Sequence, residues 1–241
     1  IDSELDKYAQ KRASNLYLPD QTIHMLPPNL SSFCSLGESE KSSALSVGFK
    51  MIDCEISDIK ILQSEIKVVK LSYEEADKAL KKDELLSKLN AITKSHKAFR
   101  NDNGAIKLDL PNVDVKLKNK KVNIQIQTES ESRKLVAEMM VIAGRVIAKY
   151  ATENKISMPF LTQEVGSFSE DIIQNKENLT ATQAFQATRC FKQSKITPKA
   201  SLHAGLGLSS YIRVTSPIRR YLDLLVQQQL VRFINNQTIL D

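Results

Sequence analysis

The sequence predicts a fold of the α+β class, and three observations support this. Apolar residues alternate with polar ones over residues 45–71 and 113–126, which is the period of strands. Apolar residues recur at helical spacing after two capping boxes, which begin at Ser72 and Thr128. The 241 residues contain 41% hydrophobic residues, enough for a core, and show no internal repeat or shift in composition. We therefore expect residues 1–241 to form part of one domain without an internal boundary.

Composition narrows the class of protein. The net charge of +6 and the pI of about 9.1 favour a polyanionic partner, although a solvated basic surface gives the same totals. The cysteines are odd in number and widely spaced, at Cys34, Cys54 and Cys190, which indicates neither disulfides nor a zinc site but a reducing cytosol. The apolar runs are too short to span a bilayer, so no membrane association is expected. The start, IDSELDKYAQ, has no signal-peptide pattern and no initiator Met, which indicates a piece of a longer chain.

The first half of the chain predicts strands followed by a helix. The stretch YLPDQTIHMLPPNLSS closes the first thirty residues as a loop, because its prolines disfavour a regular helix or central strand. A meander of two or three strands follows, with apolar positions at Leu45, Val47, Phe49, Ile59, Ile61, Ile66, Val68 and Leu71. Ser72 and Glu75 then form a capping box that opens a helix to about Phe99.

The second half predicts a hairpin and three helices. Residues 113–126 read as two strands around a turn at Asn119, with Val113, Val115 and Leu117 on one face. Thr128 and Glu131 open a helix that runs to about Tyr150. A short helix is expected at 182–192, and the segment SLHAGLGLSSYIRVT is expected to be irregular.

The hexapeptide SPIRRY carries the most informative local signal. Ser216 and Pro217 suit the N-cap and first position of a terminal helix, which places Arg219 and Arg220 where the helix dipole is already positive. A bound anion would turn this cost into a gain, because helix N–H groups and guanidinium groups together grip phosphate. Arg213, His203 and the nearby glycines could add to such a site. Alternatively, Arg219 pairs with Asp223 and Arg220 is solvated.

The segment HAGLGLSSYIRVTSPIRRYLDLLV closely resembles the signature of the RNB exoribonucleases, the ribonuclease II and ribonuclease R family. Three further stretches are similar to this family in the same order, namely RASNLYLPDQTIHMLPPNLSSFCSLGESEKSSALSVGF, GAIKLDLPNVDV and SRKLVAEMMVIAG. The resemblance covers residues 1–230. LVAEMMVIAG followed by MPF is similar to the cyanobacterial and plastid branch. The fold that this implies is an RNB catalytic domain, incomplete at both ends, with a twisted mixed sheet flanked by helices around an RNA channel.

The resemblance implies a hydrolase that degrades single-stranded RNA from the 3′ end to nucleoside 5′-monophosphates, using two magnesium ions. Arg219 matches the arginine that contacts the scissile phosphate, where charge develops in the transition state. Tyr17 matches an aromatic residue that stacks on the 3′-terminal base, and Glu138 an acidic residue that holds the terminal nucleotide. Their alternatives are packing of Tyr17 beside Leu16 and Leu18, and pairing of Glu138 with Lys134. Further RNA-binding candidates are His203, Tyr211, Arg213, Ser216 and Arg220.

The sequence also departs from the family pattern. The family's metal ligands come from an aspartate cluster of the type D-x-x-D-x-D-D shortly before the point that matches Ile1, and no such cluster occurs in the chain. We therefore expect no metal ligands in this chain, and no activity from it alone. The family pattern also differs at Ala137, Gly144, Arg213, Val214, Gln227 and Gln228.

The favoured hypothesis is therefore a fragment of a magnesium-dependent 3′→5′ exoribonuclease that acts as a monomer on single-stranded RNA. We expect a cytoplasmic location, or a plastid or other organelle if the source is eukaryotic. The first alternative is a non-catalytic RNA-binding member of the same family. The second is a basic, helix-rich scaffold for protein interactions, whose charge is only solvated.

Overall fold

The computed structural model describes residues 3–105, 113–118, 121–126, 130–168 and 180–238. The helices are α1 (Glu4–Arg12), α2 (Pro28–Phe33), α3 (Tyr73–Ala79), α4 (Glu84–Asp102), α5 (Glu131–Glu153), α7 (Ala181–Cys190), α8 (Tyr221–Ile234) and the 3-10 helix η1 (Ala204–Leu206). The strands are β1 (Leu16–Tyr17), β2 (Thr22–Ile23), β3 (Ser42–Ile52), β4 (Glu55–Ile66), β5 (Val113–Lys118), β6 (Lys121–Ile126), β7 (Phe160–Thr162) and β8 (Lys195–Thr197). The predicted α+β class is confirmed.

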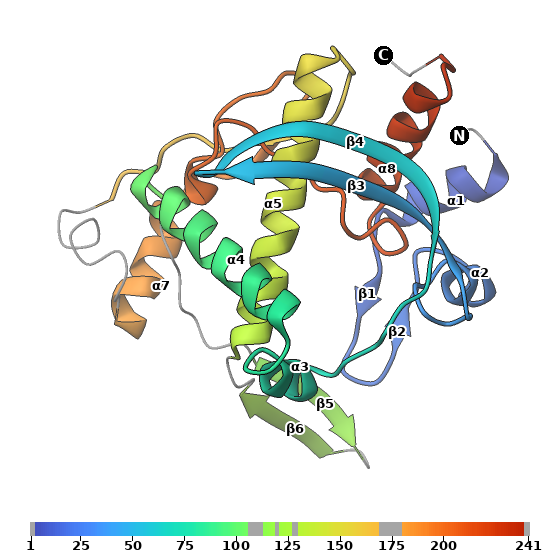
Figure 1. The fold of residues 1–241 in the computed structure, drawn as a ribbon. Helices are drawn as coiled ribbons and strands as arrows, with labels where there is room; N and C mark the ends of the chain where they lie inside the picture. The colour runs from blue at the N-terminus through green and yellow to red at the C-terminus, as the bar shows by residue number, and fades with distance from the viewer. Residues whose placement is uncertain (1–2, 106–112, 119–120, 127–129, 169–179, 239–241) are drawn as a thin grey trace.

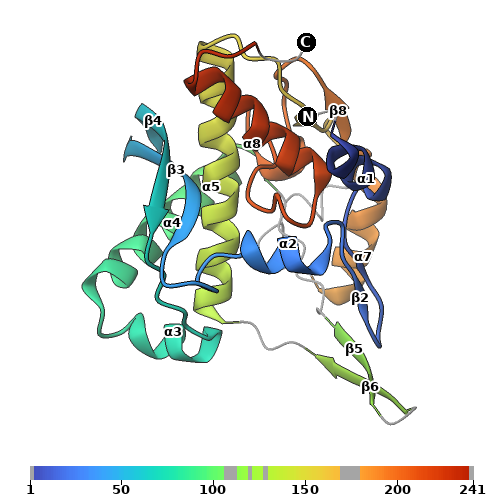
Figure 2. The same cartoon turned by 90° about the vertical axis from the view of Figure 1, so that its right-hand side faces the viewer.

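Helix α5 forms the centre of the molecule. The β3–β4 hairpin arches across it as a long curved ribbon, and α4 packs along it (Figure 1). Helix α8 lies on the other side and contacts both β4 and α1 (Figure 2). The main core fills the space between these elements, where Ile147, Ile212, Val226 and Leu230 have no exposed surface. Burial of such side chains supplies most of the driving force for this packing.

The described strands pair two by two instead of forming the expected single mixed sheet. Each pair is antiparallel, in the order β1–β2, β3–β4, β5–β6 and β7–β8. The predicted meander is the β3–β4 hairpin, whose Val47, Phe49 and Ile59 pack against the core as their alternation predicted. Because β4 ends at Ile66, Val68 and Leu71 lie beyond the strand.

The helix predicted from Ser72 to about Phe99 is in fact two helices. The capping box of Ser72 and Glu75 is present, but α3 ends at Ala79. Asp83 then accepts a hydrogen bond from the N–H of Leu86, at 2.9 Å, and starts α4. An aspartate side chain competes for local backbone N–H groups, so it favours a new helix start over a continued helix.

Several predicted helix ends also change. The N-cap of α5 is Ser130, which accepts a hydrogen bond from the N–H of Arg133, whereas Thr128 lies outside the described residues. The first thirty residues contain α1, which their sequence pattern did not reveal. Pro28 begins α2 within the predicted loop, because proline suits the first turn of a helix. The helix expected at 182–192 is α7, with a capping box of Thr180 and Gln183.

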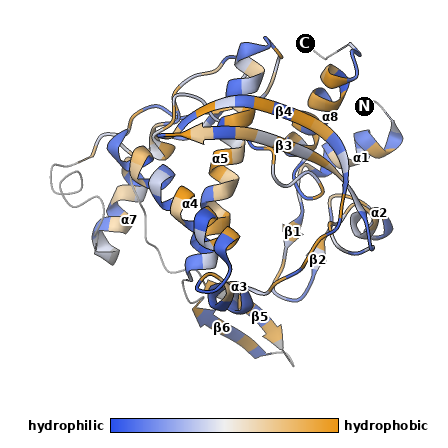
Figure 3. Ribbon diagram, viewed as in Figure 1, coloured by the Kyte–Doolittle hydropathy of each residue, from blue (hydrophilic) through white to orange (hydrophobic). Residues whose placement is uncertain are grey.

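The predicted hairpin of residues 113–126 is the β5–β6 pair, whose turn at Asn119 lies outside the described residues. Its apolar residues pair across the two strands, Val113 with Ile126, Val115 with Ile124 and Leu117 with Val122, and all six are exposed. Figure 3 shows the alternation of apolar and polar residues along this hairpin, which projects from the rest of the chain.

Among the helices that the structure describes, none combines the length and the apolar character that a membrane span requires.

Candidate RNA-binding site

The SPIRRY segment forms a tight turn before it becomes a helix. The carbonyl of Ser216 accepts hydrogen bonds from the N–H groups of Arg219, at 3.2 Å, and Arg220, at 3.0 Å. Helix α8 begins only at Tyr221, so the prediction that it starts at Pro217 is wrong. The reason is tertiary, because Arg220 pairs as an isolated β-bridge with Ser14, and this extended conformation interrupts the helix.

The two neighbouring arginines have different surroundings. Arg220 forms an ion pair with the buried carboxylate of Asp223, with 2.7 Å between Nη2 and Oδ2. The alternative in which Arg219 pairs with Asp223 is therefore wrong. Arg219 is exposed, and its guanidinium has no hydrogen bond or ion pair with any described residue. A guanidinium in this state is available to an anion from solution.

The turn is bonded to the N-terminal segment that carries Tyr17. The N–H of Asn15 donates to the carbonyl of Arg219 at 3.0 Å, and the N–H of Tyr221 donates to the carbonyl of Ala13 at 2.8 Å. Tyr17 follows in β1, with 60% of its surface exposed. Its ring is therefore not part of a core with Leu16 and Leu18, which are themselves exposed.

Tyr211 and His203 form an aromatic pair beside the turn. Their ring centroids lie 5.8 Å apart, with the rings nearly perpendicular at 84°. The Tyr211 ring packs against α5 at Gly144, where any Cβ atom would collide with the ring and with the carbonyl of Ile212. The departure from the family pattern at Gly144 is thus matched to its surroundings, because only glycine lets the segment of Tyr211 approach the helix so closely.

Charges converge on this aromatic pair. Burial raises the pKa of Tyr211, while the positive charges of Arg213, Arg220 and Arg100 act in the opposite direction. Burial also lowers the pKa of His203, and the charge of Arg213 adds to this effect. Both rings are therefore neutral near pH 7 in a positive environment. Arg213 itself is exposed and has no hydrogen bond or ion pair within the described parts of the chain.

The glycine-bearing loop before Tyr211 is irregular, as predicted, and is fixed from two sides. Its Gly205 N–H donates to Oε1 of Gln163 at 2.9 Å, and Arg100 Nη1 donates to the carbonyl of Leu206 at 3.1 Å. Gly207 adopts a left-handed backbone with φ of 63°, and the space that a Cβ atom would occupy is taken by the carbonyl of Arg100. A side chain at this position would be strained and would collide with α4.

Glu138 occupies a buried position behind this loop. Its carboxylate accepts two hydrogen bonds from Arg100, at 2.8 Å and 2.6 Å, and one from His96 Nδ1 at 2.6 Å. Burial disfavours its ionised form, but the bonds from Arg100 and His96 outweigh burial and lower the pKa of Glu138 to about 2. The predicted alternative partner, Lys134, instead bonds to Glu131 at 3.3 Å.

The predicted site residues thus fall into three groups by exposure. Tyr17, Arg213 and Arg219 are exposed, Tyr211 and Arg220 are half-buried, and Glu138, His203 and Ser216 are buried. The sequence analysis missed the partners that hold the buried group in place, namely Arg100, His96 and Gln163. The signal for Arg100 was a cation in the last turn of a predicted helix, followed by a glycine turn.

The described residues do not fit a magnesium site. No three or more His, Cys, Asp and Glu side chains within them lie close enough together to hold a metal ion. Asp223, the carboxylate at the turn, already binds Ser216 and Arg220 through one oxygen. What these residues can do is bind and orient an anionic ligand.

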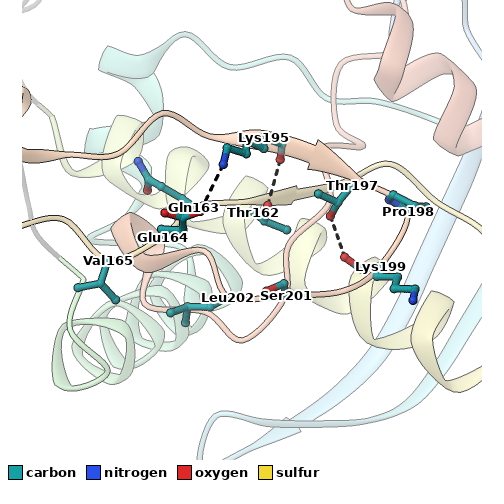
Figure 4. A pocket seen from close by; sticks show the side chains of 10 residues that line it. All are labelled: Thr162, Gln163, Glu164, Val165, Lys195, Thr197, Pro198, Lys199, Ser201 and Leu202. Atoms are coloured by element: carbon teal, nitrogen blue, oxygen red, sulfur yellow. Dashed lines mark hydrogen bonds and ion pairs between the residues drawn. The ribbon is translucent and has the colours of Figure 1, made fainter.

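A separate pocket of about 630 Å³ lies between the β7–β8 pair and the loop that follows it (Figure 4). Its only ion pair within the described residues joins Lys195 to Glu164 at 3.3 Å. None of the eight predicted site residues lines it. Its residues are Thr162, Gln163, Glu164, Val165, Lys195, Thr197, Pro198, Lys199, Ser201 and Leu202.

The α+β fold exposes the guanidinium groups of Arg213 and Arg219 and the side chain of Tyr17, which are groups able to contact an anionic ligand. The chain belongs to the RNB domain family, which matches residues 1–236. An uncharacterized ribonuclease of Synechocystis sp. is 32% identical over 98% of this chain and 37% of its own length. This similarity to a cyanobacterial protein confirms the predicted resemblance. The chain thus spans little more than a third of that relative.

Solved structures confirm the predicted RNB fold. Mycoplasma genitalium RNase R in complex with ribose-methylated single-stranded RNA superimposes with a TM-score of 0.85 and 21% identity, over 99% of this chain and 45% of that one. Yeast Ssd1, described as a pseudonuclease, superimposes with a TM-score of 0.77 and 20% identity, over 100% of this chain and 35% of Ssd1. The fold is therefore shared by a nuclease and by a pseudonuclease.

Proposed function

We propose that this chain is the RNA-holding part of a hydrolytic 3′→5′ exoribonuclease, which degrades single-stranded RNA to nucleoside 5′-monophosphates. The observation that carries this proposal is the exposed guanidinium of Arg219. It lies on a turn bonded through Asn15 to the segment of the exposed Tyr17. An exposed cation and an exposed aromatic side chain are thus carried by one hydrogen-bonded unit, and single-strand binding commonly uses this combination of groups.

The eight residues divide into two proposed roles. Arg219 contacts the scissile phosphate, Tyr17 stacks on a terminal base, and Arg213 and Tyr211 face the RNA backbone. The buried Ser216, His203 and Glu138 and the half-buried Arg220 hold these contacts in place. Glu138 is assigned to this second role because its oxygens already accept bonds from Arg100 and His96. It therefore acts on the terminal nucleotide through the loop that Arg100 anchors.

We extend the proposal to the parent protein, which would use two magnesium ions. Two such ions, when bound, supply an activated water and stabilise the leaving oxygen. Their ligands would come from an aspartate cluster outside this chain. A monomeric state and a location in the cytoplasm or an organelle are likewise part of the proposal.

The test is an RNA-binding titration of this chain with labelled single-stranded RNA. We expect affinity to fall steeply between about 50 and 200 mM salt, because each neutralised phosphate releases a counterion. The same protein is then incubated with 5′-labelled RNA and magnesium, and the products are resolved on a sequencing gel. Binding without cleavage is the expected result. A ladder that shortens from the 3′ end would show instead that a metal site exists within these residues.

A non-catalytic RNA-binding protein of the same family is the second candidate. It is favoured by the fold similarity to a pseudonuclease. The residues encoded just upstream of Ile1 discriminate between the two, because only an active nuclease needs the aspartate cluster there. The third hypothesis, a protein-interaction scaffold, predicts no salt-dependent affinity for RNA. The titration therefore separates it from both RNA-binding candidates.

A further inference from the structure

The side chain of Asp223 has an unusual position for a carboxylate. It has no exposed surface and lies in the first turn of α8, where the helix dipole favours a negative charge. Its Oδ2 accepts two hydrogen bonds, one from the N–H of Ser216 at 2.9 Å and one from Nη2 of Arg220 at 2.7 Å. A buried charge is tolerated only when it is paired in this way.

These two bonds close the turn from both ends. Ser216 begins the turn and Arg220 ends it, and both are attached to the same oxygen atom. Arg219 lies between them, with its backbone carbonyl bonded to Asn15. Its side chain is therefore the part of this turn that remains directed to solvent, on a backbone fixed on three sides.

The pair also depends on both partners. Oδ1 of Asp223 and Nε of Arg220 are buried and have no hydrogen-bond partner among the described residues. Removal of the Arg220 charge would therefore leave the carboxylate of Asp223 buried without a counter-charge, and removal of the Asp223 charge would leave the half-buried guanidinium of Arg220 without its partner. The guanidinium of Arg220 is engaged by Asp223, whereas that of Arg219 is not.

We propose that Asp223 is a positioning residue that gives the two adjacent arginines different tasks. It holds the guanidinium of Arg220 against the turn, and thereby presents Arg219 to a phosphate of the RNA. This inference rests on the proposed function for the identity of the ligand. The role of Asp223 in fixing the conformation of the turn does not depend on any ligand.

The proposal predicts an effect of unusual sign. Loss of a negative charge near a polyanion should by simple electrostatics raise RNA affinity. We expect Asp223→Asn to lower the affinity of this chain for single-stranded RNA about tenfold, because Arg219 is no longer held. In a protein that already carries Arg219→Ala, Asp223→Asn should change the RNA affinity by less than about twofold, since the arginine that Asp223 positions is gone.

The experiment measures RNA affinity for the wild-type chain, Asp223→Asn, Arg219→Ala and the double variant, with circular dichroism to check folding. Glu84→Gln is the matched control, because it removes an exposed carboxylate from the first turn of α4. If Asp223→Asn does not fold, Asp223→Glu replaces it. This change keeps the negative charge but shifts the carboxylate relative to Ser216 and Arg220, and it should also lower the affinity. Unchanged or raised affinity, or losses that multiply in the double variant, would overturn the inference.

Hydrogen exchange of the Ser216 amide provides a readout that needs no RNA. We expect it to be protected in the wild type and to exchange at least about tenfold faster in Asp223→Asn, because its acceptor is weakened. If the wild-type chain does not bind RNA, the proposed function fails, and this exchange rate alone tests whether Asp223 orders the turn. Equal exchange in the two proteins would contradict the role given to Asp223.

Discussion

The N–H of Asn15 donates a hydrogen bond of 3.0 Å to the carbonyl of Arg219, and so joins two segments from opposite ends of the chain. The side chain of Asn15 also accepts a bond from the N–H of Met25 at 2.7 Å. The exposed Tyr17 and the exposed Arg219 are therefore carried by one bonded unit. This relationship is what gives the predictions for both residues a shared structural basis.

Arg219→Ala should leave stability unchanged and impair function. In the intact parent enzyme, turnover should fall far more than RNA affinity, because the contact strengthens as charge develops in the transition state. Single-turnover cleavage and an equilibrium titration measure the two quantities. Arg189→Ala, which removes an exposed arginine from α7, is the control. Equal losses of turnover and affinity would remove Arg219 from the reaction centre.

Tyr17→Ala should weaken binding to short RNAs by about 1–3 kcal/mol, the usual value of one stacked base. The melting temperature of this variant should stay that of the wild type, since 60% of the surface of Tyr17 is exposed. In the parent enzyme the length of the final product should change as well, and a sequencing gel measures it. An unchanged product pattern would indicate that no base stacks on Tyr17.

Gly144→Ala should destabilise the protein by about 1–3 kcal/mol, because the new methyl group collides with the ring of Tyr211 and the carbonyl of Ile212. Gly48→Ala is the control, since a Cβ at Gly48 meets nothing within 4 Å. Urea unfolding measures the free energy of unfolding of both variants. Equal stability of the two variants would mean that Tyr211 does not pack on α5 in this way.

Glu138 should make stability depend on pH in the acid range. Its pKa is about 2 in the folded protein against 4.5 for the free side chain, so the folded state favours the ionised form. The resulting stabilisation, on the order of 3 kcal/mol, is complete above about pH 4.5 and is lost as the pH falls toward 2. Urea unfolding at a series of pH values measures this dependence.

Glu138→Gln should lose about 3–5 kcal/mol at neutral pH, because Arg100 then has no buried counter-charge. Its stability should also change less with pH than that of the wild type below about pH 4.5. Glu84→Gln, which alters an exposed ion pair with Lys88, should keep the wild-type pH dependence. Parallel curves for the wild type and Glu138→Gln would contradict the stabilising role of the carboxylate.

Much of the local structure could be predicted because it depends on neighbours in the sequence. The capping box at Ser72, the strand alternation around Val47 and the hairpin of residues 113–126 all follow from contacts between near residues. The start of α4 was missed although its cap, Asp83, is local, whereas the predicted start of α8 failed because of a distant segment. The start of α8 moved from Pro217 to Tyr221 because Ser14 pairs with Arg220 across the fold.

The sequence alone determined the α+β class, the RNB resemblance and the choice of Arg219 and Tyr17 as candidates, because residue types at a fixed spacing can be recognised without coordinates. Only the tertiary structure decided which arginine is free and which is engaged. Arg219 and Arg220 are adjacent residues of the same type. The buried carboxylate of Asp223 bonds Arg220, however, and leaves Arg219 in solvent. The physical reason is that burial and pairing depend on contacts that the spacing of residues along a chain does not specify.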